Sequence, residues 1–186
     1  MAKPKREDLR VRRTKRLLST ALYNLIKRKP FDKITVCDIC EEAMVHRATF
    51  YAHFSDKEEL LVRSIDEHLP MKTEGSSPDG ESSKIVEDII NYISENKDVY
   101  LSIFKKDGAF SVSEKIQSMF SAKLLDLINE RIKNGTVIPV SPRFWADFYA
   151  GACITVVQKW LSGERNVSKE VLIDNLNTLL HASYNA

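Results

Sequence analysis

The sequence contains few of the residues that mark irregular, disulfide-bonded or membrane-spanning proteins. Six glycines and six prolines among 186 residues argue against an extended, turn-rich architecture. Three cysteines are too few for a disulfide framework and fit a reducing compartment. The longest apolar run, near residues 148–157, is interrupted by Gly and Thr and is too short to span a bilayer. Because no apolar segment follows the charged N-terminus, we expect no signal peptide, no membrane partner and a cytoplasmic location.

Motifs of the common enzyme classes are also missing from the sequence. It has no nucleophile elbow, no phosphate-binding glycine loop and no carboxylate pair suited to acid–base catalysis. The four histidines are scattered, and the spacing of His46, His53 and His68 matches no metal site. We therefore expect a protein that is not an enzyme, without catalytic residues, a metal or a cofactor.

Cys37 and Cys40 form a C-x-x-C motif, which is compatible with zinc binding or redox chemistry. A tetrahedral zinc site would need a second such pair or two histidines at matching spacing, and the sequence contains neither. Cys40 falls on an apolar stripe where a small core residue belongs, so a structural role is favoured. Cys37 lies near the start of the same helix, and a thiol-sensing role stays open.

The small net charge of +2 conceals an uneven distribution along the chain. Residues 1–69 carry 15 Lys and Arg against 11 Asp and Glu, whereas the remaining residues carry 13 against 15. Residues 1–16 alone carry eight basic and two acidic side chains. This asymmetry indicates that the N-terminal part contacts a polyanion. We expect residues 1–13 to form a flexible basic arm, with phosphate contact favoured over the alternative of a solubilising tail.

The segment 35–61 predicts two short helices joined by a tight turn, with another helix directly after them. Thr35 and Asp38 suit a helix start, because a hydroxyl caps a free amide and a carboxylate favours the positive end. The apolar stripe of this first helix consists of Val36, Ile39, Cys40 and Ala43. The second helix begins near His46 or Arg47.

The second of these helices combines one aromatic side with a small, polar opposite side. Phe50 and Phe54 lie one turn apart and point the same way. The opposite side carries Ala48, Thr49 and Ala52, flanked by Arg47, Tyr51 and His53. Alanine and the threonine methyl group suit thymine methyls, and arginine bridges the acceptors of guanine. Such a helix fits the major groove of DNA, and the alternative is an ordinary solvated face.

Three patterns with fixed spacing connect residues 14–61 to a known family. They are Thr-Val-x-Asp-Ile, Thr-Φ-Tyr-x-His-Phe and Ser-x-Lys-Glu-x-Leu, matched by Thr35, Val36, Asp38, Ile39, Thr49, Phe50, Tyr51, His53, Phe54, Ser55, Lys57, Glu58 and Leu60. This segment resembles the TetR/AcrR transcriptional regulators. Two positions depart from the family pattern. Met44 replaces the usual corner glycine and would be strained at positive φ, and His46 replaces a stronger Ser or Thr cap.

The resemblance implies an all-α fold with two domains. A three-helix helix-turn-helix DNA-binding head occupies residues 14–69, and a helical effector-binding and dimerisation domain occupies residues 84–186. Between them, residues 70–83 are rich in Pro, Gly and Ser and predict a linker. Apolar spacing and cap signals predict helices over 14–29, from a Ser55–Glu58 capping box onward, over 83–95, over 98–105, from a Ser111–Glu114 capping box to 134, over 141–162 and from Ser168 onward.

Double-stranded DNA is the partner that the helix-turn-helix implies. We predict DNA contacts by Thr35, Val36, Cys37, Arg47, Ala48, Thr49, Tyr51, His53 and Lys57. Arg47, Ala48 and Thr49 are assigned to base edges. Tyr51 and His53, which flank the groove-facing side, are assigned to phosphate or sugar, and Thr35 and Lys57, at helix starts, to phosphate.

The C-terminal part carries many aromatic residues and one helix that is apolar on nearly all sides. A helix of this kind must be covered by more than one neighbour, and the resemblance implies a homodimer formed by the last two helices. It also implies a small apolar or aromatic effector. Candidate ligand residues are Tyr100, Phe104, Phe120, Trp145, Tyr149 and Cys153, with plain core packing as the alternative for each.

The sequence therefore predicts a TetR-like regulator that represses transcription from a palindromic operator and is released by a small inducer. An alternative is a TetR-like adaptor or coactivator that binds another protein and has no operator of its own.

Overall fold

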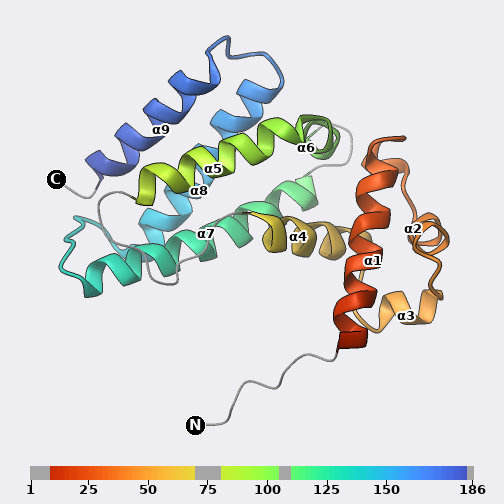
Figure 1. The fold of residues 1–186 in the computed structure, drawn as a ribbon. Helices are drawn as coiled ribbons and strands as arrows, with labels where there is room; N and C mark the ends of the chain where they lie inside the picture. Colours follow the sequence, from red (N-terminus) through yellow and green to blue (C-terminus); the bar gives the residue numbers. More distant parts are fainter. Residues whose placement is uncertain (1–8, 70–80, 105–109, 184–186) are drawn as a thin grey trace, which may run out of the picture. The chain divides into compact units, whose positions relative to one another are not determined.

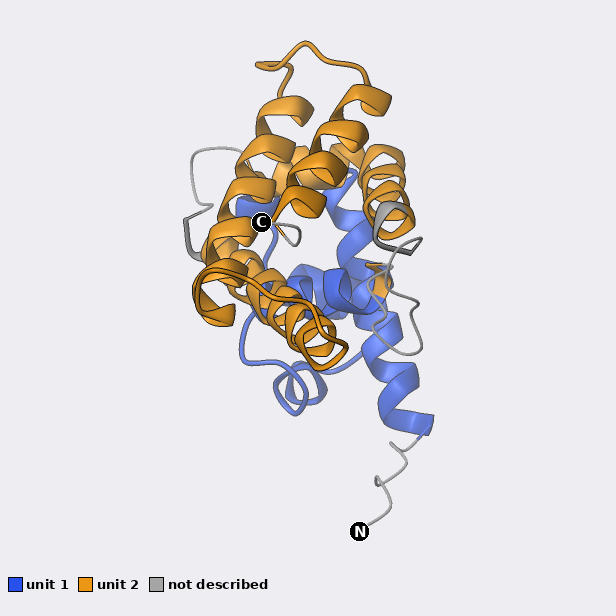
Figure 2. Ribbon diagram, turned by 90° about the vertical axis from the view of Figure 1, so that its left-hand side faces the viewer, with its two compact units in different colours: residues 1–67 blue, residues 68–186 orange. Residues whose placement is uncertain are grey.

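The structure, a computed structural model, describes residues 9–69, 81–104 and 110–183 (Figure 1). These ranges contain helices and turns and no β-strand, which confirms the predicted all-α fold. The chain divides into two compact units, residues 1–67 and residues 68–186 (Figure 2). None of the helices in the described ranges combines the length and apolar character that a membrane crossing requires.

The first unit contains a helix-turn-helix between two longer helices. Its elements are α1 (Leu9–Ile26), the short 3-10 helix η1 (Phe31–Lys33), α2 (Val36–Ala43), α3 (Arg47–Tyr51) and α4 (Lys57–His68). Each helix contributes at least one fully or almost fully buried apolar side chain to the core: Leu18, Leu22, Ile39, Phe50, Leu60, Leu61 and Ile65. At a few kcal/mol per buried side chain, this core is what holds the five-residue helix α3 in place.

The start of α1 differs from the sequence prediction. The helix begins at Leu9, so residues 9–13, expected to belong to a flexible arm, are helical, and residues 1–8 lie outside the described part. The sequence predicts a helix start near Thr14, yet the Thr14 hydroxyl donates to the Arg10 carbonyl at 3.0 Å, four residues back within the helix. The apolar repeat marks only the buried turns of a helix. Arginine is a good helix former and extends α1 beyond them.

The capping box before α4 is displaced by one residue from the predicted Ser55–Glu58 pair. Asp56 accepts a hydrogen bond from the Glu59 amide at 2.6 Å, and the Glu59 carboxylate accepts one from the Ser55 amide at 2.8 Å. Both serine and aspartate are good caps, so the sequence does not decide between the two registers. In the observed register, Glu59 accepts from the Ser55 hydroxyl, at 2.8 Å, as well as from the Ser55 amide.

Met44 occupies the left-handed conformation at the corner between α2 and α3. Its φ and ψ are 54° and 44°, the only positive φ of a non-glycine residue in the described chain, and its side chain is 90% exposed. The Val45 amide donates to the Cys40 carbonyl at 3.0 Å and the Met44 amide to Glu41 at 3.1 Å. This double closure is a Schellman motif, which normally has glycine at the left-handed position. The corner therefore keeps its geometry despite the departure from the family pattern.

Replacing Met44 by glycine is expected to stabilise the first unit by about 1 kcal/mol, because glycine adopts this conformation without a steric penalty. For a chain of this size, the shift in Tm is roughly 2–4 °C. Thermal unfolding followed by circular dichroism measures it, with Met44→Ala as the matched control. The alanine variant loses the same side chain and keeps the strain, so an equal rise in Tm for both variants would contradict this explanation.

The second unit consists of α5 (Glu81–Glu95), α6 (Lys97–Phe104), α7 (Phe110–Lys133), α8 (Pro142–Leu161) and α9 (Lys169–Ala182). Residues 81–83, predicted as the end of the linker, belong to α5, and residues 70–80 lie outside the described part. The chain is already helical at Phe110, so Ser111 does not precede α7 as a cap. The serine caps of α8 and α9 are as predicted: Ser141 accepts from the Phe144 amide and Ser168 from the Val171 amide, both at 3.3 Å.

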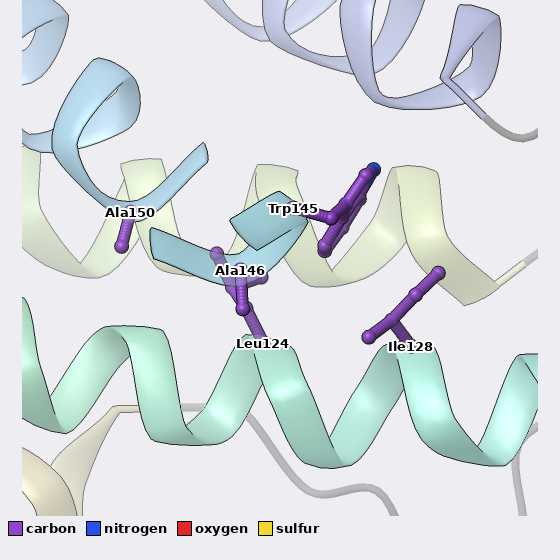
Figure 3. Packing of buried hydrophobic residues seen from close by; sticks show 5 residues of the cluster. All are labelled: Leu124, Ile128, Trp145, Ala146 and Ala150. Carbon is purple, nitrogen blue, oxygen red and sulfur yellow. The ribbon is translucent and has the colours of Figure 1, made fainter. Parts of the chain in front are cut away.

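The core of the second unit is centred on the packing of α7 against α8 (Figure 3). Leu124 and Ile128 of α7 point toward Trp145 and Ala146 of α8, and Ala150 extends the same buried face. The small alanines allow the two backbones to approach, while Trp145, 3% exposed, fills the remaining space.

Candidate nucleic-acid interface

The N-terminus of α2 is fixed by a complete capping box. The Thr35 hydroxyl accepts from the Asp38 amide at 3.1 Å, and Asp38 Oδ2 accepts from the Thr35 amide at 2.7 Å. Lys29 adds an ion pair to Asp38 at 2.8 Å, and this bond, with those from Thr35, holds the pKa of Asp38 well below its usual range. The cap satisfies two amides of the first turn. The amides of Val36 and Cys37 have no acceptor within an α-helix and suit an anion.

α3 presents its polar side chains outward, as the sequence predicts. Arg47 and Ala48 are exposed, Tyr51 is 52% exposed, and Thr49 is half-buried. On the opposite side, the Phe50 ring is fully buried, with its centroid 5.9 Å from that of Phe54. The aromatic side of α3 therefore anchors the helix to the first unit, and the predicted DNA-facing side is exposed to solvent. Contact of these residues with DNA stays a prediction.

Arg47 and Tyr51 are adjacent on this outward side. Tyr51 lies one turn after Arg47, and the interaction of its hydroxyl with the guanidinium raises the pKa of Arg47. A guanidinium that is already oriented loses less side-chain entropy when it binds a base or a phosphate. The two predicted contacts therefore act as a pair.

Cys37 lies beside this pair and is exposed, whereas Cys40 is buried. The Cys37 thiol donates to Glu41 Oε1 at 3.4 Å, and this bond together with the glutamate charge raises the pKa of Cys37. Because the thiolate is the reactive form, a raised pKa argues against the thiol-sensing alternative. In the described part of the chain, no group of three or more His, Cys, Asp or Glu is arranged to hold a metal ion.

Lys57 does not present the free ammonium that a phosphate contact requires. Its Nζ donates to the carbonyl oxygens of Phe31 at 2.9 Å, Asp32 at 3.2 Å and Ile34 at 2.7 Å. An ammonium has three donors, so all of them are used. The ammonium also lies 4.7 Å from the centroid of the Phe31 ring. The predicted phosphate contact by Lys57 stays a prediction, with which these three carbonyls compete. They lie more than 20 residues away in the chain, so the sequence gives no sign of them.

The six candidate ligand residues fall into separate groups. Phe120, Trp145 and Tyr149 belong to the α7–α8 core, with the Trp145 and Tyr149 ring centroids 4.6 Å apart. Tyr100 stacks on Phe104 within α6, at 6.4 Å. Cys153 is half-buried, and burial raises its pKa to about 11.

Two polar features of the second unit depend on how its helices pack and are not evident from the sequence: the unpaired state of the Tyr100 hydroxyl and a groove between two helices. The Tyr100 hydroxyl is buried without a hydrogen-bond partner, and burial raises the pKa of Tyr100. A groove of about 870 Å³ lies between α5 and α9, lined by Lys84, Glu87, Asp88, Ile173, Asp174, Asn177, Thr178 and His181. Its residues recur at helical spacing on two segments far apart in sequence, so only the packing of the helices reveals the groove.

Comparison with known proteins covers both units. Residues 18–63 match the family model described as bacterial regulatory proteins of the tetR family, and residues 80–182 match one described as a transcriptional regulator C-terminal region. The second match alone spans more than half of the chain. The relatives are transcriptional regulators and not enzymes, as the sequence predicted.

Individual relatives are more distant. The chain is 39% identical over 90 residues to the HTH-type transcriptional regulator YxbF of Bacillus subtilis, covering 46% of this chain and 24% of that protein. It is 28% identical over 98 residues to DhaS of Lactococcus lactis, the dhaKLM operon transcriptional activator, covering 52% of each. The chain thus spans at most about half the length of these curated relatives.

Solved structures share the fold along almost the whole chain. The structure of DhaS superposes with a TM-score of 0.63 at 22% identity, covering 92% of this chain and 96% of that one. Thermus thermophilus FadR, a repressor in complex with lauroyl-CoA, also gives a TM-score of 0.63, at 16% identity, covering 92% and 95%. With the two family matches and a capped helix-turn-helix in its first unit, the chain belongs to the TetR family of bacterial transcriptional regulators.

Proposed function

We propose that this regulator is a homodimer that recognises a pseudo-palindromic operator through α2 and α3 of each protomer. The observation that carries the proposal is the two-sided character of α3: Phe50 is fully buried, while Arg47 and Ala48 on the other side are exposed. A rigid helix held from behind presents its small and cationic side chains to base edges without a large entropic cost.

Within this interface, Arg47, Ala48 and Thr49 read base edges. Tyr51 and His53 bind phosphate or sugar, as do the capped start of α2 at Thr35 and the free amides of Val36 and Cys37. The basic first turns of α1 add further phosphate contacts. Arg10, Arg12 and Arg13 are all exposed at its N-terminus, where the helix dipole disfavours cations and a polyanion offsets this cost.

Dimerisation is supported by an uncovered apolar stripe in the second unit. Phe144 and Phe148, one turn apart on α8, are 62% and 60% exposed, and Leu179 on α9 is 59% exposed. Large apolar side chains at this exposure favour a partner surface, and a second copy of the chain supplies a matching one. Two heads about 34–36 Å apart then read both halves of a palindrome.

A small effector that binds the second unit would oppose DNA binding. The buried, unpartnered hydroxyl of Tyr100 supports a ligand with a hydrogen-bond acceptor, and the surrounding aromatic rings favour an apolar or aromatic body. If the effector and the operator prefer different separations of the two heads, each lowers the affinity for the other by the same factor. The regulator then represses until the effector binds.

A second candidate is activation of transcription, alone or as an adaptor for another protein. The similarity to DhaS, named as a transcriptional activator, supports this direction of control. The exposed Met44 at the helix-turn-helix corner offers an apolar contact for a protein partner.

Selection of binding sites from a random duplex library tests the proposal. The expected result is a palindromic consensus whose half-sites lie one helical turn apart, bound by a dimer. Binding to all duplexes alike, with an affinity that falls steeply with salt and no enriched sequence, would instead support the adaptor.

Replacing Tyr51 by alanine is expected to weaken operator binding at least tenfold at moderate salt. The variant loses the proposed phosphate contact and also the hydroxyl that interacts with the Arg47 guanidinium. Fluorescence anisotropy with the selected operator measures the affinity, and circular dichroism checks that helicity is unchanged. Tyr51→Phe is the matched control, since it keeps the ring and removes only the hydroxyl. Wild-type affinity in both variants would remove Tyr51 from the interface.

A further inference from the structure

The first residue of α4 is bonded to the segment that leads into α2. The three carbonyls that bind the Lys57 ammonium belong to Phe31, Asp32 and Ile34, and the next residue after them is Thr35, the cap of α2. A cation at the first position of a helix is disfavoured by the helix dipole. In this position the carbonyl oxygens offset that cost, and the Lys57 side chain is half-buried.

The neighbouring contacts restrict this segment further. Phe31 is 6% exposed, and the Lys57 ammonium lies over its ring, 4.7 Å from the centroid. Ile34, 1% exposed, packs into the core, and its amide donates to the Phe31 carbonyl at 3.1 Å. The segment 31–34 is thus held by apolar burial on one side and by a single ammonium on the other.

We propose that Lys57 is a positioning residue for DNA binding: it fixes segment 31–34, and through it the free amides at the start of α2, without touching the DNA itself. This inference rests on the proposed DNA-binding function. It also makes Lys57 a direct link between α4 and the DNA-facing surface, because three converging bonds transmit a displacement of α4 to Thr35. A phosphate contact, the alternative role, would require the ammonium to give up at least one of these three acceptors.

Two substitutions separate positioning from phosphate contact. Lys57→Met removes the charge and keeps the apolar stem, whereas Lys57→Arg keeps the charge but cannot aim a planar guanidinium at three converging carbonyls. Lys33→Met is the matched control. It removes the same positive charge from segment 31–34 itself. The Lys33 side chain is 75% exposed, and its ion pair is with the adjacent Asp32, at 3.6 Å.

The measurement is the affinity for the selected operator as a function of salt, at a temperature where each variant is folded. For positioning, Lys57→Met weakens binding at least tenfold and Lys57→Arg at least threefold. Neither variant changes the slope of log K against log [salt], and Lys33→Met stays within about threefold of the wild type. For phosphate contact, Lys57→Arg binds normally and Lys57→Met lowers the slope by about 1 per protomer, which would overturn the inference.

Amide hydrogen exchange at Thr35 and Asp38 gives a readout that needs no DNA. Faster exchange at this cap in both Lys57 variants, and not in Lys33→Met, is expected from positioning. Unchanged exchange would overturn the inference even if DNA affinity falls. If the wild type binds no DNA while the exchange result holds, the proposed function fails and the link between α4 and α2 stands.

Discussion

Replacing Phe50 by alanine is expected to abolish operator binding by releasing α3, the proposed DNA-reading helix, from the first unit. α3 has only five residues, far below the length at which an isolated helix is stable in water. Its buried anchor is the fully buried Phe50 ring, which lies against Phe54 and Tyr51 with centroids 5.9 and 5.4 Å away. Truncating a buried phenylalanine costs about 3–5 kcal/mol, a large part of the 5–15 kcal/mol typical of a whole domain.

Phe50→Leu is the matched control for this experiment, because leucine fills most of the space and costs less. We expect anisotropy to show no binding of Phe50→Ala to the selected operator, and binding within about tenfold of the wild type for Phe50→Leu. Heteronuclear NMR spectra should show loss of dispersed signals for the first unit in the alanine variant. Retention of wild-type affinity by Phe50→Ala would mean that α3 is anchored by other contacts.

The helix-turn-helix could be predicted from the sequence because its determinants are local. The Thr35–Asp38 cap, the Phe50–Phe54 pair and the corner at Met44 each depend on residues within a few positions of one another. The fixed spacing of the family pattern supplied the arrangement of the helices in space, which local signals do not give. For the same reason, the outward orientation of Arg47 agrees with the prediction.

In the first unit, the sequence could not give a helix boundary or a hydrogen-bond partner where neither is encoded locally. The start of α1 has no apolar repeat, so the helical residues 9–13 were expected to be an arm. The partners of Lys57 lie 23 to 26 residues before it in the chain. The family pattern supplies a lysine at that position, but only the packing of α4 against segment 31–34 shows what its ammonium binds.

In the second unit, the sequence predicts helices well and the roles of their aromatic residues poorly. Trp145 and Phe148 are three positions apart in one apolar helix, yet they are 3% and 60% exposed. The periodicity of the sequence cannot show which of the two is buried, because α8 is apolar on nearly all sides and has no clear polar face. Deciding which residue belongs to the core, to a ligand site or to an interface requires knowing which helices cover each side.

Phe148 is the residue where this distinction has the largest expected consequence. It lies on the uncovered side of α8 with Phe144, one turn earlier, and Ala152, one turn later, and all three are exposed. A carboxylate at this position would be buried twice in a symmetric dimer, once from each protomer. The desolvation penalty is several kcal/mol per ion when no partner charge is present, so the Phe148→Asp dimer should dissociate at least 100-fold more readily.

Sedimentation velocity at micromolar concentration is expected to show a dimer for the wild type and a folded monomer for Phe148→Asp. Operator affinity should fall at least tenfold at the same time, because a monomer engages only one half-site and loses the gain from linking two heads. Ser118→Asp, which adds the same charge to an exposed position of α7, is the matched control and should stay dimeric. A monomeric wild type would contradict the dimer outright. A dimeric Phe148→Asp would place the interface on another surface, because two unpaired carboxylates cannot be held in an apolar contact without that cost.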